Sequence, residues 1–119
     1  HNQIINKDEI FNYLNNKDFT YYKLTELTFF EKVYLFKNAN CILGVHGAGF
    51  ANLAFCKPKT NVLEIRPHSY PNEIYKKISE INDLNYHLLE TRIIEKNKNP
   101  NGDINLSIDE VDRILEKFN

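Results

Sequence analysis

The sequence has little excess charge of either sign and no long hydrophobic run. Its 15 Lys and Arg residues against 16 Asp and Glu residues leave a formal net charge of -1. Bulk electrostatics therefore give no reason to bind nucleic acid or an anionic membrane. No apolar run approaches the roughly 20 residues that a membrane span requires, and residues 1–9 contain no apolar signal segment. We expect any anchor or targeting address to lie outside this chain.

Cysteine is also scarce. Cys41 and Cys56 are too few for a disulfide framework and too far apart for CxxC redox chemistry or a zinc knuckle. We expect both to be buried thiols, because free cysteine behaves as a small apolar core residue. Hydrophobic residues, by contrast, make up 42% of the 119 residues, which is too rich for a disordered chain. The length predicts one globular domain over residues 1–119.

Helical and strand patterns alternate along this domain. Helical periodicity or capping residues predict helices over 7–16 with Asn6 as its cap, 28–38, 72–82 and 107–118, with a short helical segment over 50–56. Apolar or aromatic runs predict strands over 19–24, 41–45, 62–65 and 86–91, and turn residues predict a loop over 95–103. Short connections between such elements favour right-handed crossovers and a parallel sheet. We therefore predict an α/β, Rossmann-like fold with three α/β/α layers and a mainly parallel sheet.

The segment Cys41–Val45 is almost continuously apolar, which is typical of a strand covered on both faces. We predict that it is the central strand. Directly after it comes Gly44-Val-His-Gly-Ala-Gly-Phe-Ala-Asn52. Ligands of open parallel sheets bind at the carboxyl ends of the strands, where a glycine-rich turn can bring backbone N–H groups to a phosphate.

Residues 46–49 of this segment, His46, Gly47, Ala48 and Gly49, are therefore a candidate diphosphate cradle at the rim of the largest polar cleft. Gly47 and Gly49 lack a Cβ and can take positive φ. The alternative is a tight strand-to-helix turn without a ligand. The spacing matches neither GxGxxG nor GxxxxGK[ST], which argues against the usual NAD and ATP sites.

Three polar side chains near the loop are candidate ligand contacts. His46 could donate to a phosphate or sugar hydroxyl, pass a proton, or be purely structural. No second His or Cys stands at metal-ligand spacing, so we expect no metal. Asn52 could cap the following segment or contact the ligand. Glu64 interrupts an apolar strand, and either accepts hydrogen bonds from ribose hydroxyls, faces outward at an edge, or pairs with Arg66.

A ribose-binding Glu64 is expected to be solvated in the cleft of the empty protein. His68, Tyr70 and His87 are weaker candidates, since they stand in a loop or on a strand face open to solvent. The sequon at Asn105 is expected by chance in an Asn-rich chain and carries no functional inference.

The motifs together resemble glycosyltransferase family 61. His46–Phe55, followed by Lys57-Pro58 and Val62–Ile65, is similar to the family signature. Upstream, Ile5-Asn6 with Asp8-Glu9, and Glu26–Glu31 with Leu35-Phe36 and Ala39, are similar to its other conserved segments, so that the resemblance covers roughly residues 4–90. The family includes plant xylosyltransferases, animal protein O-linked N-acetylglucosaminyltransferases and bacterial proteins of capsular polysaccharide synthesis.

The resemblance implies the carboxyl-terminal, nucleotide-sugar-binding half of a two-domain enzyme of GT-B architecture. Such an enzyme moves a sugar from a nucleoside diphosphate, with UDP expected, to a hydroxyl of a glycan or protein acceptor, and inverts the anomeric centre. It implies no cofactor and no essential metal. The general base and the acceptor contacts are expected in an amino-terminal domain, with His46 assisting. The compartment would be the cytoplasm in a bacterium and the endoplasmic reticulum or Golgi lumen in a eukaryote.

A second function class stays open at the level of sequence. The chain could be a non-enzymatic α/β module that binds a nucleotide, a carbohydrate or a protein partner. The feature that favours the transferase is the conjunction of His46, Gly47, Gly49, Asn52 and Glu64 around one predicted sheet edge.

Overall fold

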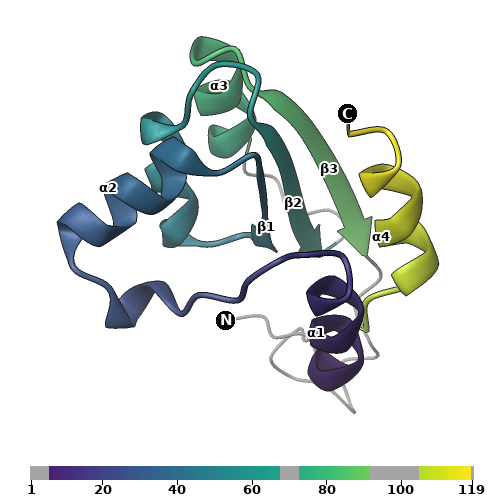
Figure 1. Cartoon of the computed structure of the whole chain (residues 1–119). Coiled ribbons are helices and arrows are strands. Elements are labelled where there is room, and N and C mark those ends of the chain that lie inside the picture. The colour runs from purple at the N-terminus through teal and green to yellow at the C-terminus, as the bar shows by residue number, and fades with distance from the viewer. Residues whose placement is uncertain (1–5, 68–72, 92–104, 119) are drawn as a thin grey trace.

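The part of the chain that the structure describes is built on a parallel sheet of three strands. The computed structural model describes residues 6–67, 73–91 and 105–118. Within them the sheet has the order β1-β2-β3, formed by β1 (Cys41–Val45), β2 (Asn61–Pro67) and β3 (Asn85–Thr91) (Figure 1). Both neighbouring pairs are parallel, with Gly44 opposite Glu64 and Glu64 opposite Leu88. The predicted α/β class and the parallel sheet are confirmed.

The central strand is β2, so the prediction that Cys41–Val45 is central is wrong. Within the described sheet β1 is an edge strand, and its residues are only half-buried. Val62, Leu63 and Ile65 of β2 are 0% exposed. An apolar run indicates that both faces of a strand are covered, but it does not indicate whether the strand has a neighbour on one side or on both. The sequence pattern therefore could not distinguish an edge strand from a central one.

The predicted strand over 19–24 is also absent from the described structure. Residues 19–23 run without regular structure into a short 3₁₀ helix, η1 (Leu24–Glu26). Tyr21 and Tyr22 are 65% and 48% exposed. The ring of Tyr21 packs against the ring of Phe11, with 4.6 Å between the ring centroids. Aromatic residues favour strands only where their rings pack on a pleated, half-buried sheet surface. Tyr21 and Tyr22 are instead exposed, outside any strand.

Two helices cover one face of the sheet. They are α1 (Lys7–Asn15) and α4 (Ile108–Leu115), seen together on one side of the strands in Figure 1. The core on this face consists of Ile10, Leu63, Ile65, Leu89, Leu106, Val111 and Phe118. Asn6 stands at the amino end of α1 as predicted, but its side chain makes no cap bond. It donates to the Leu106 carbonyl at 2.7 Å and accepts from the Leu106 N–H at 2.9 Å.

The opposite face carries α2 (Phe29–Asn38), the 3₁₀ helix η2 (Ala48–Phe55) and α3 (Ile74–Ile81). The predicted capping box is present at α2, where Thr28 and Glu31 exchange both hydrogen bonds. At α4, Ser107 accepts from the Glu110 N–H at 3.3 Å. The second core consists of Phe36, Phe50, Leu53, Cys56, Val62 and Tyr75. The sheet is therefore covered on both faces.

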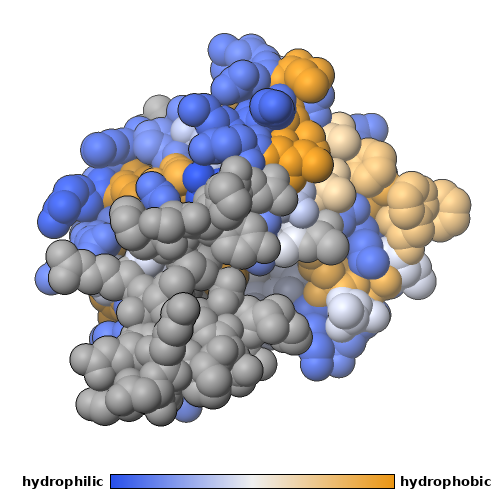
Figure 2. Space-filling view, turned by 180° about the vertical axis from the view of Figure 1, so that it is seen from behind, coloured by the Kyte–Doolittle hydropathy of each residue, from blue (hydrophilic) through white to orange (hydrophobic). Residues whose placement is uncertain are grey.

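One part of the surface is apolar. Phe29, Phe30 and Tyr34 of α2 are 61%, 81% and 72% exposed. In the view from behind, hydrophobic surface projects on the side of the molecule where α2 lies (Figure 2). None of the helices in the described ranges is long and apolar enough to cross a membrane. The predicted loop over 95–103, the first residue of the predicted helix 72–82, His68 and Tyr70 lie outside the described residues.

Candidate functional site at the carboxyl edge of the sheet

The glycine loop lies where the sequence predicts, at the carboxyl end of β1. The His46 N–H donates to the Ile65 carbonyl at 2.7 Å, which extends the pairing with β2 by one residue. The Phe50 N–H then donates to the Gly47 carbonyl at 3.0 Å as the chain turns into η2. Parallel α/β proteins bind ligands at this edge of the sheet.

Close packing accounts for two of the three described glycines, and none of the three has positive φ in the left-handed region. Gly47 has φ 173°, which is extended backbone, and neither Gly47 nor Gly49 adopts the left-handed conformation that the sequence suggested. A Cβ on Gly44 would lie 3.2 Å from the Phe50 ring, and one on Gly49 would lie 2.8 Å from Leu24. Among the described residues, a Cβ on Gly47 would meet only the Val45 carbonyl oxygen, at 3.8 Å. Packing within the described fold therefore accounts for Gly44 and Gly49 but leaves room for a side chain at Gly47.

A buried carboxylate lies beside the loop. Glu64 is 1% exposed, and its Oε2 is hydrogen-bonded to Nδ1 of His46. Its Oε1 accepts a hydrogen bond from the Tyr86 hydroxyl at 2.5 Å. The His46 side chain is 8% exposed, and its ring lies 4.9 Å from the ring of Tyr75. Three elements, the loop, β2 and β3, thus converge on one carboxylate.

This geometry corrects two expectations about Glu64. The carboxylate is not solvated, because its side chain is buried and each oxygen has a donor. Nor does Arg66 serve as its ion-pair partner among the described residues, since the ion pair of Arg66 is with Glu73 at 3.3 Å. A buried carboxylate is tolerated only when hydrogen bonds compensate its lost hydration, and His46 and Tyr86 supply them.

Tyr86 was not among the predicted site residues. Burial, the hydrogen bond to Glu64 and the negative charge of Glu64 raise the pKa of Tyr86 far above its ordinary value. The hydroxyl therefore remains protonated and able to donate across the physiological range. Strand alternation could have pointed to it, because Tyr86 lies opposite Val62, two residues before Glu64 on the same face of β2.

Asn52 stabilises the loop from within. Its side-chain amide donates to the Gly49 carbonyl at 2.9 Å, so within η2 it makes a local hydrogen bond that is not the predicted cap. Ala48 begins η2 directly after Gly47. The six predicted site residues thus belong to one region, in which Glu64 contacts His46 and Asn52 contacts Gly49. Contact with a ligand stays a prediction for all six.

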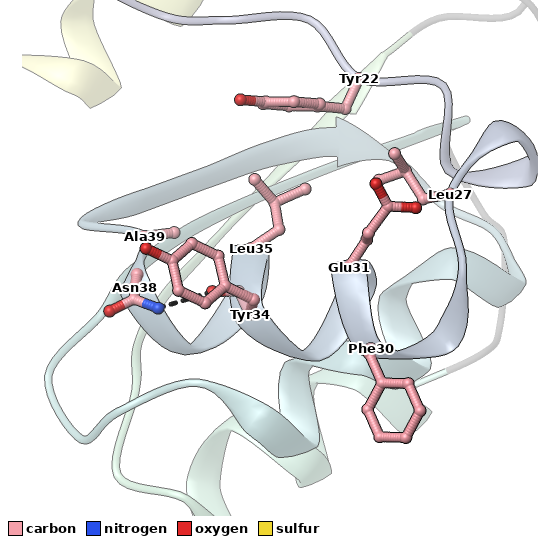
Figure 3. A pocket seen from close by; sticks show the side chains of 8 residues that line it. All are labelled: Tyr22, Leu27, Phe30, Glu31, Tyr34, Leu35, Asn38 and Ala39. Atoms are coloured by element: carbon pink, nitrogen blue, oxygen red, sulfur yellow. Dashed lines mark hydrogen bonds between the residues drawn. The ribbon is translucent and has the colours of Figure 1, made fainter.

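Two surface pockets lie away from this region. The first, of about 600 Å³, is lined by Tyr22, Leu27, Phe30, Glu31, Tyr34, Leu35, Asn38 and Ala39. In Figure 3 Tyr22 faces Leu35 and Tyr34 of α2 across this pocket, while Phe30 points away from them. The second, of about 490 Å³, includes Asn40 and Asn61 near the opposite edge of the sheet. A polar cleft at the glycine loop stays a prediction.

The thiols and acidic groups offer no further reactive site among the described residues. Burial raises the pKa of Cys41 and of Cys56 to about 11, so both thiols are poor nucleophiles at neutral pH. Cys56 is buried as predicted, whereas Cys41 is half-buried. The described residues contain no group of three His, Cys, Asp or Glu side chains placed to hold a metal ion. His87 is half-buried and its ring lies 4.8 Å from Phe118, so the prediction that it faces solvent is wrong.

The fold and the loop define a parallel α/β domain with a glycine-rich turn at the strand ends. The model of the family described as Glycosyltransferase 61 matches residues 1–63, just over half of the chain. The chain belongs to this family. The matched region includes the glycine loop and ends one residue before Glu64. No match was found among curated proteins or among solved structures.

Proposed function

We propose that the chain forms the nucleotide-sugar donor-binding domain of a glycosyltransferase. The donor is a nucleoside diphosphate sugar, with UDP as the expected nucleotide, and the acceptor is a hydroxyl of a glycan or protein. The observation that carries the proposal is the glycine loop at the carboxyl end of β1, inside the family-matched region. This edge is where parallel α/β sheets place their ligands.

Gly47 is the position at which the loop is best suited to a diphosphate. Because the part of the fold that the structure describes leaves space for a Cβ there, packing among those residues does not require a glycine. A phosphate that approaches the backbone closely would require it instead. Backbone N–H donors of such a loop can stabilise the negative charge that develops on a leaving diphosphate, which is the role that a metal ion has in other transferases. This supports transfer without a metal ion, and inversion of the anomeric centre is proposed from the family resemblance alone.

His46 is the side chain of the loop that is best placed to assist. Glu64 and the Tyr75 ring fix its imidazole at the edge of the sheet. Glu64 itself is assigned to the site through His46, since its two oxygens are occupied by His46 and Tyr86. Acceptor binding and the general base are assigned to an amino-terminal domain of the complete enzyme, as in GT-B transferases.

The substitution Gly47→Ala tests this function directly. UDP binding is measured by calorimetry in the presence of EDTA, and the free energy of unfolding is measured by urea denaturation. We expect the dissociation constant to rise about tenfold or more, equivalent to about 1.4 kcal/mol. Unfolding should change by less than about 0.5 kcal/mol, because the added methyl group has space. Unchanged UDP affinity in the folded variant would remove the loop from the site.

A further inference from the structure

We propose that Tyr86 is a positioning residue that controls, through Glu64, the orientation in which His46 is held with its proton on Nδ1. The hydroxyl of Tyr86 and the imidazole of His46 bind opposite oxygens of the same buried carboxylate. Neither Tyr86 nor this control follows from the family match, which ends at residue 63. The inference concerns the donor site named above, but its first test does not depend on the proposed function.

The hydrogen bond between Glu64 and His46 fixes which ring nitrogen carries a hydrogen. An ionised carboxylate only accepts hydrogen bonds, so the Nδ1 atom that contacts Glu64 must carry a hydrogen. In the neutral ring the lone pair then resides on Nε2. Any hydroxyl proton that His46 accepts is therefore accepted at Nε2.

Tyr86 enters because a carboxylate has two equivalent oxygens and can rotate. The Tyr86 hydroxyl donates to Oε1 of Glu64 at 2.5 Å, so the other oxygen, Oε2, faces His46. The Tyr86 ring packs beside the second core, where Val62 and Tyr75 are buried, so the phenol is itself held in place. The raised pKa of Tyr86 keeps this donor protonated. Tyr86 of β3 thus positions Glu64 of β2, and Glu64 positions His46 of the glycine loop.

The substitution Glu64→Gln should change the tautomer of His46, and this change can be measured. An amide has one oxygen that accepts and one nitrogen that donates. If the Tyr86 phenol donates to the amide oxygen, the amide nitrogen faces Nδ1 of His46. Nδ1 must then accept, and the ring must adopt the Nε2–H tautomer. In the double variant with Tyr86→Phe the amide is free to turn its oxygen toward Nδ1, so the Nδ1–H tautomer should return as part of a mixture.

Long-range ¹H–¹⁵N NMR of the histidine rings in the nucleotide-free chain reads these tautomers, with a His46→Asn variant to assign the signals. We expect the Nδ1–H form in the wild type, the Nε2–H form in Glu64→Gln, and a mixture in the double variant. Amide spectra establish that each variant is folded. A persistent Nδ1–H form in Glu64→Gln, or a persistent Nε2–H form in the double variant, would overturn the proposal.

The single variant Tyr86→Phe provides a second measurement that keeps the native Glu64 carboxylate. It removes one hydroxyl and keeps the ring. We expect the His46 Nδ1 hydrogen to exchange with water about tenfold faster, which is the factor implied by loss of a hydrogen bond to a charged group. Tyr34→Phe, at a tyrosine that is 72% exposed on α2, is the matched control and should leave the exchange rate unchanged. An unchanged rate in Tyr86→Phe would contradict the role of Tyr86.

The consequence for nucleotide binding rests on the proposed function. If His46 contacts the donor, Tyr86→Phe should raise the dissociation constant for UDP about three- to tenfold. The two ideas fail separately. Tautomers that switch as expected in a chain that does not bind UDP would contradict the donor-site proposal alone. UDP binding with tautomers that do not switch would contradict the positioning role alone.

Discussion

At the scale of single residues, the Glu64 carboxylate is the most constrained group that the structure describes near the loop. It is 1% exposed and depends on His46 and Tyr86 for its hydrogen bonds. Removing one donor leaves part of a buried charge uncompensated, and that loss exceeds the net value of an ordinary hydrogen bond. The stability of the fold and the geometry of the site are therefore coupled at this residue.

The coupling predicts a stability difference between two tyrosines. Tyr86→Phe should lower the free energy of unfolding by about 1 to 3 kcal/mol, the range for hydrogen bonds that involve a charged group. Tyr34→Phe removes the same atom from a side chain that is 72% exposed and should change stability by less than about 0.5 kcal/mol. Urea denaturation of the two variants measures both values. Equal effects would mean that the Tyr86 bond is energetically unimportant.

His87 predicts a dependence of stability on pH. Burial and the positive charge of Lys117 lower the pKa of His87, and among the described residues its Nδ1 has no hydrogen-bond partner. The folded state therefore resists protonation beside Phe118. Stability from this group is complete above the unfolded pKa of about 6.5 and is lost as the pH falls from there toward the lower folded pKa.

The measurement compares urea unfolding at pH 7.5 and pH 5.5 for the wild type and His87→Leu. The wild type should lose more stability between these two values than the variant, because only the wild type has an imidazole that binds a proton more readily in the unfolded state than in the folded state. Identical losses in the two proteins would show that His87 does not contribute to the pH dependence.

At the scale of elements, α2 has two unlike faces. Phe36 is 4% exposed and packs in the second core, whereas Phe30 on the same helix is 81% exposed. Helical periodicity placed Phe36 correctly on the buried face, since Phe29, Val33 and Phe36 recur at helical spacing. It did not anticipate that Phe29 is 61% exposed, because periodicity identifies the most apolar face of a helix and cannot show what covers each part of it.

This asymmetry predicts very different costs for the same substitution. Phe36→Ala should reduce the free energy of unfolding by about 3 to 5 kcal/mol, the usual range for a buried aromatic ring. Phe30→Ala should change it by less than about 0.5 kcal/mol. Thermal or urea unfolding of both variants decides the matter. A large loss in Phe30→Ala would show that the exposed face of α2 is packed against something in solution.

The elements of the sheet show how far sequence patterns reach. Runs of β-branched and apolar residues identified β2, and capping residues located the start of α2, because these signals are local. The order of strands was not predictable in the same way. It depends on which hydrogen-bonding edges meet, and β1 and β2 carry similar apolar runs although only β2 is central among the described strands.

At the scale of the whole molecule, the site was partly predictable for the same reason. The loop position followed from local order, a strand and then glycines, and the structure confirms it. The contact between Glu64 and His46 joins residues 18 apart, and that between Glu64 and Tyr86 joins residues 22 apart. Only the parallel register brings these three side chains together. The sequence therefore left the surroundings of Glu64 open, and the expectation of a solvated carboxylate, tied to ribose binding, is wrong because the fold buries it.

The proposed division of labour makes a prediction for the chain as a whole. Residues 1–119 should bind UDP weakly and should not transfer sugar from UDP-sugars to hydroxyl acceptors, because acceptor contacts and the general base are assigned to another domain. Product analysis with UDP-GlcNAc and UDP-xylose measures transfer. Robust transfer by this chain would refute the assignment of those functions to a separate domain.

The central claim is that the glycine loop binds the nucleotide diphosphate. Titration of the ¹⁵N-labelled chain with UDP in the presence of EDTA, followed by amide NMR, tests this claim most directly. The account predicts that the largest shifts occur in residues 44–52 and at the carboxyl end of β2, with α4 unaffected. The absence of shifts at the loop, or shifts centred on the α2 pocket or on the pocket near Asn40 and Asn61, would contradict it.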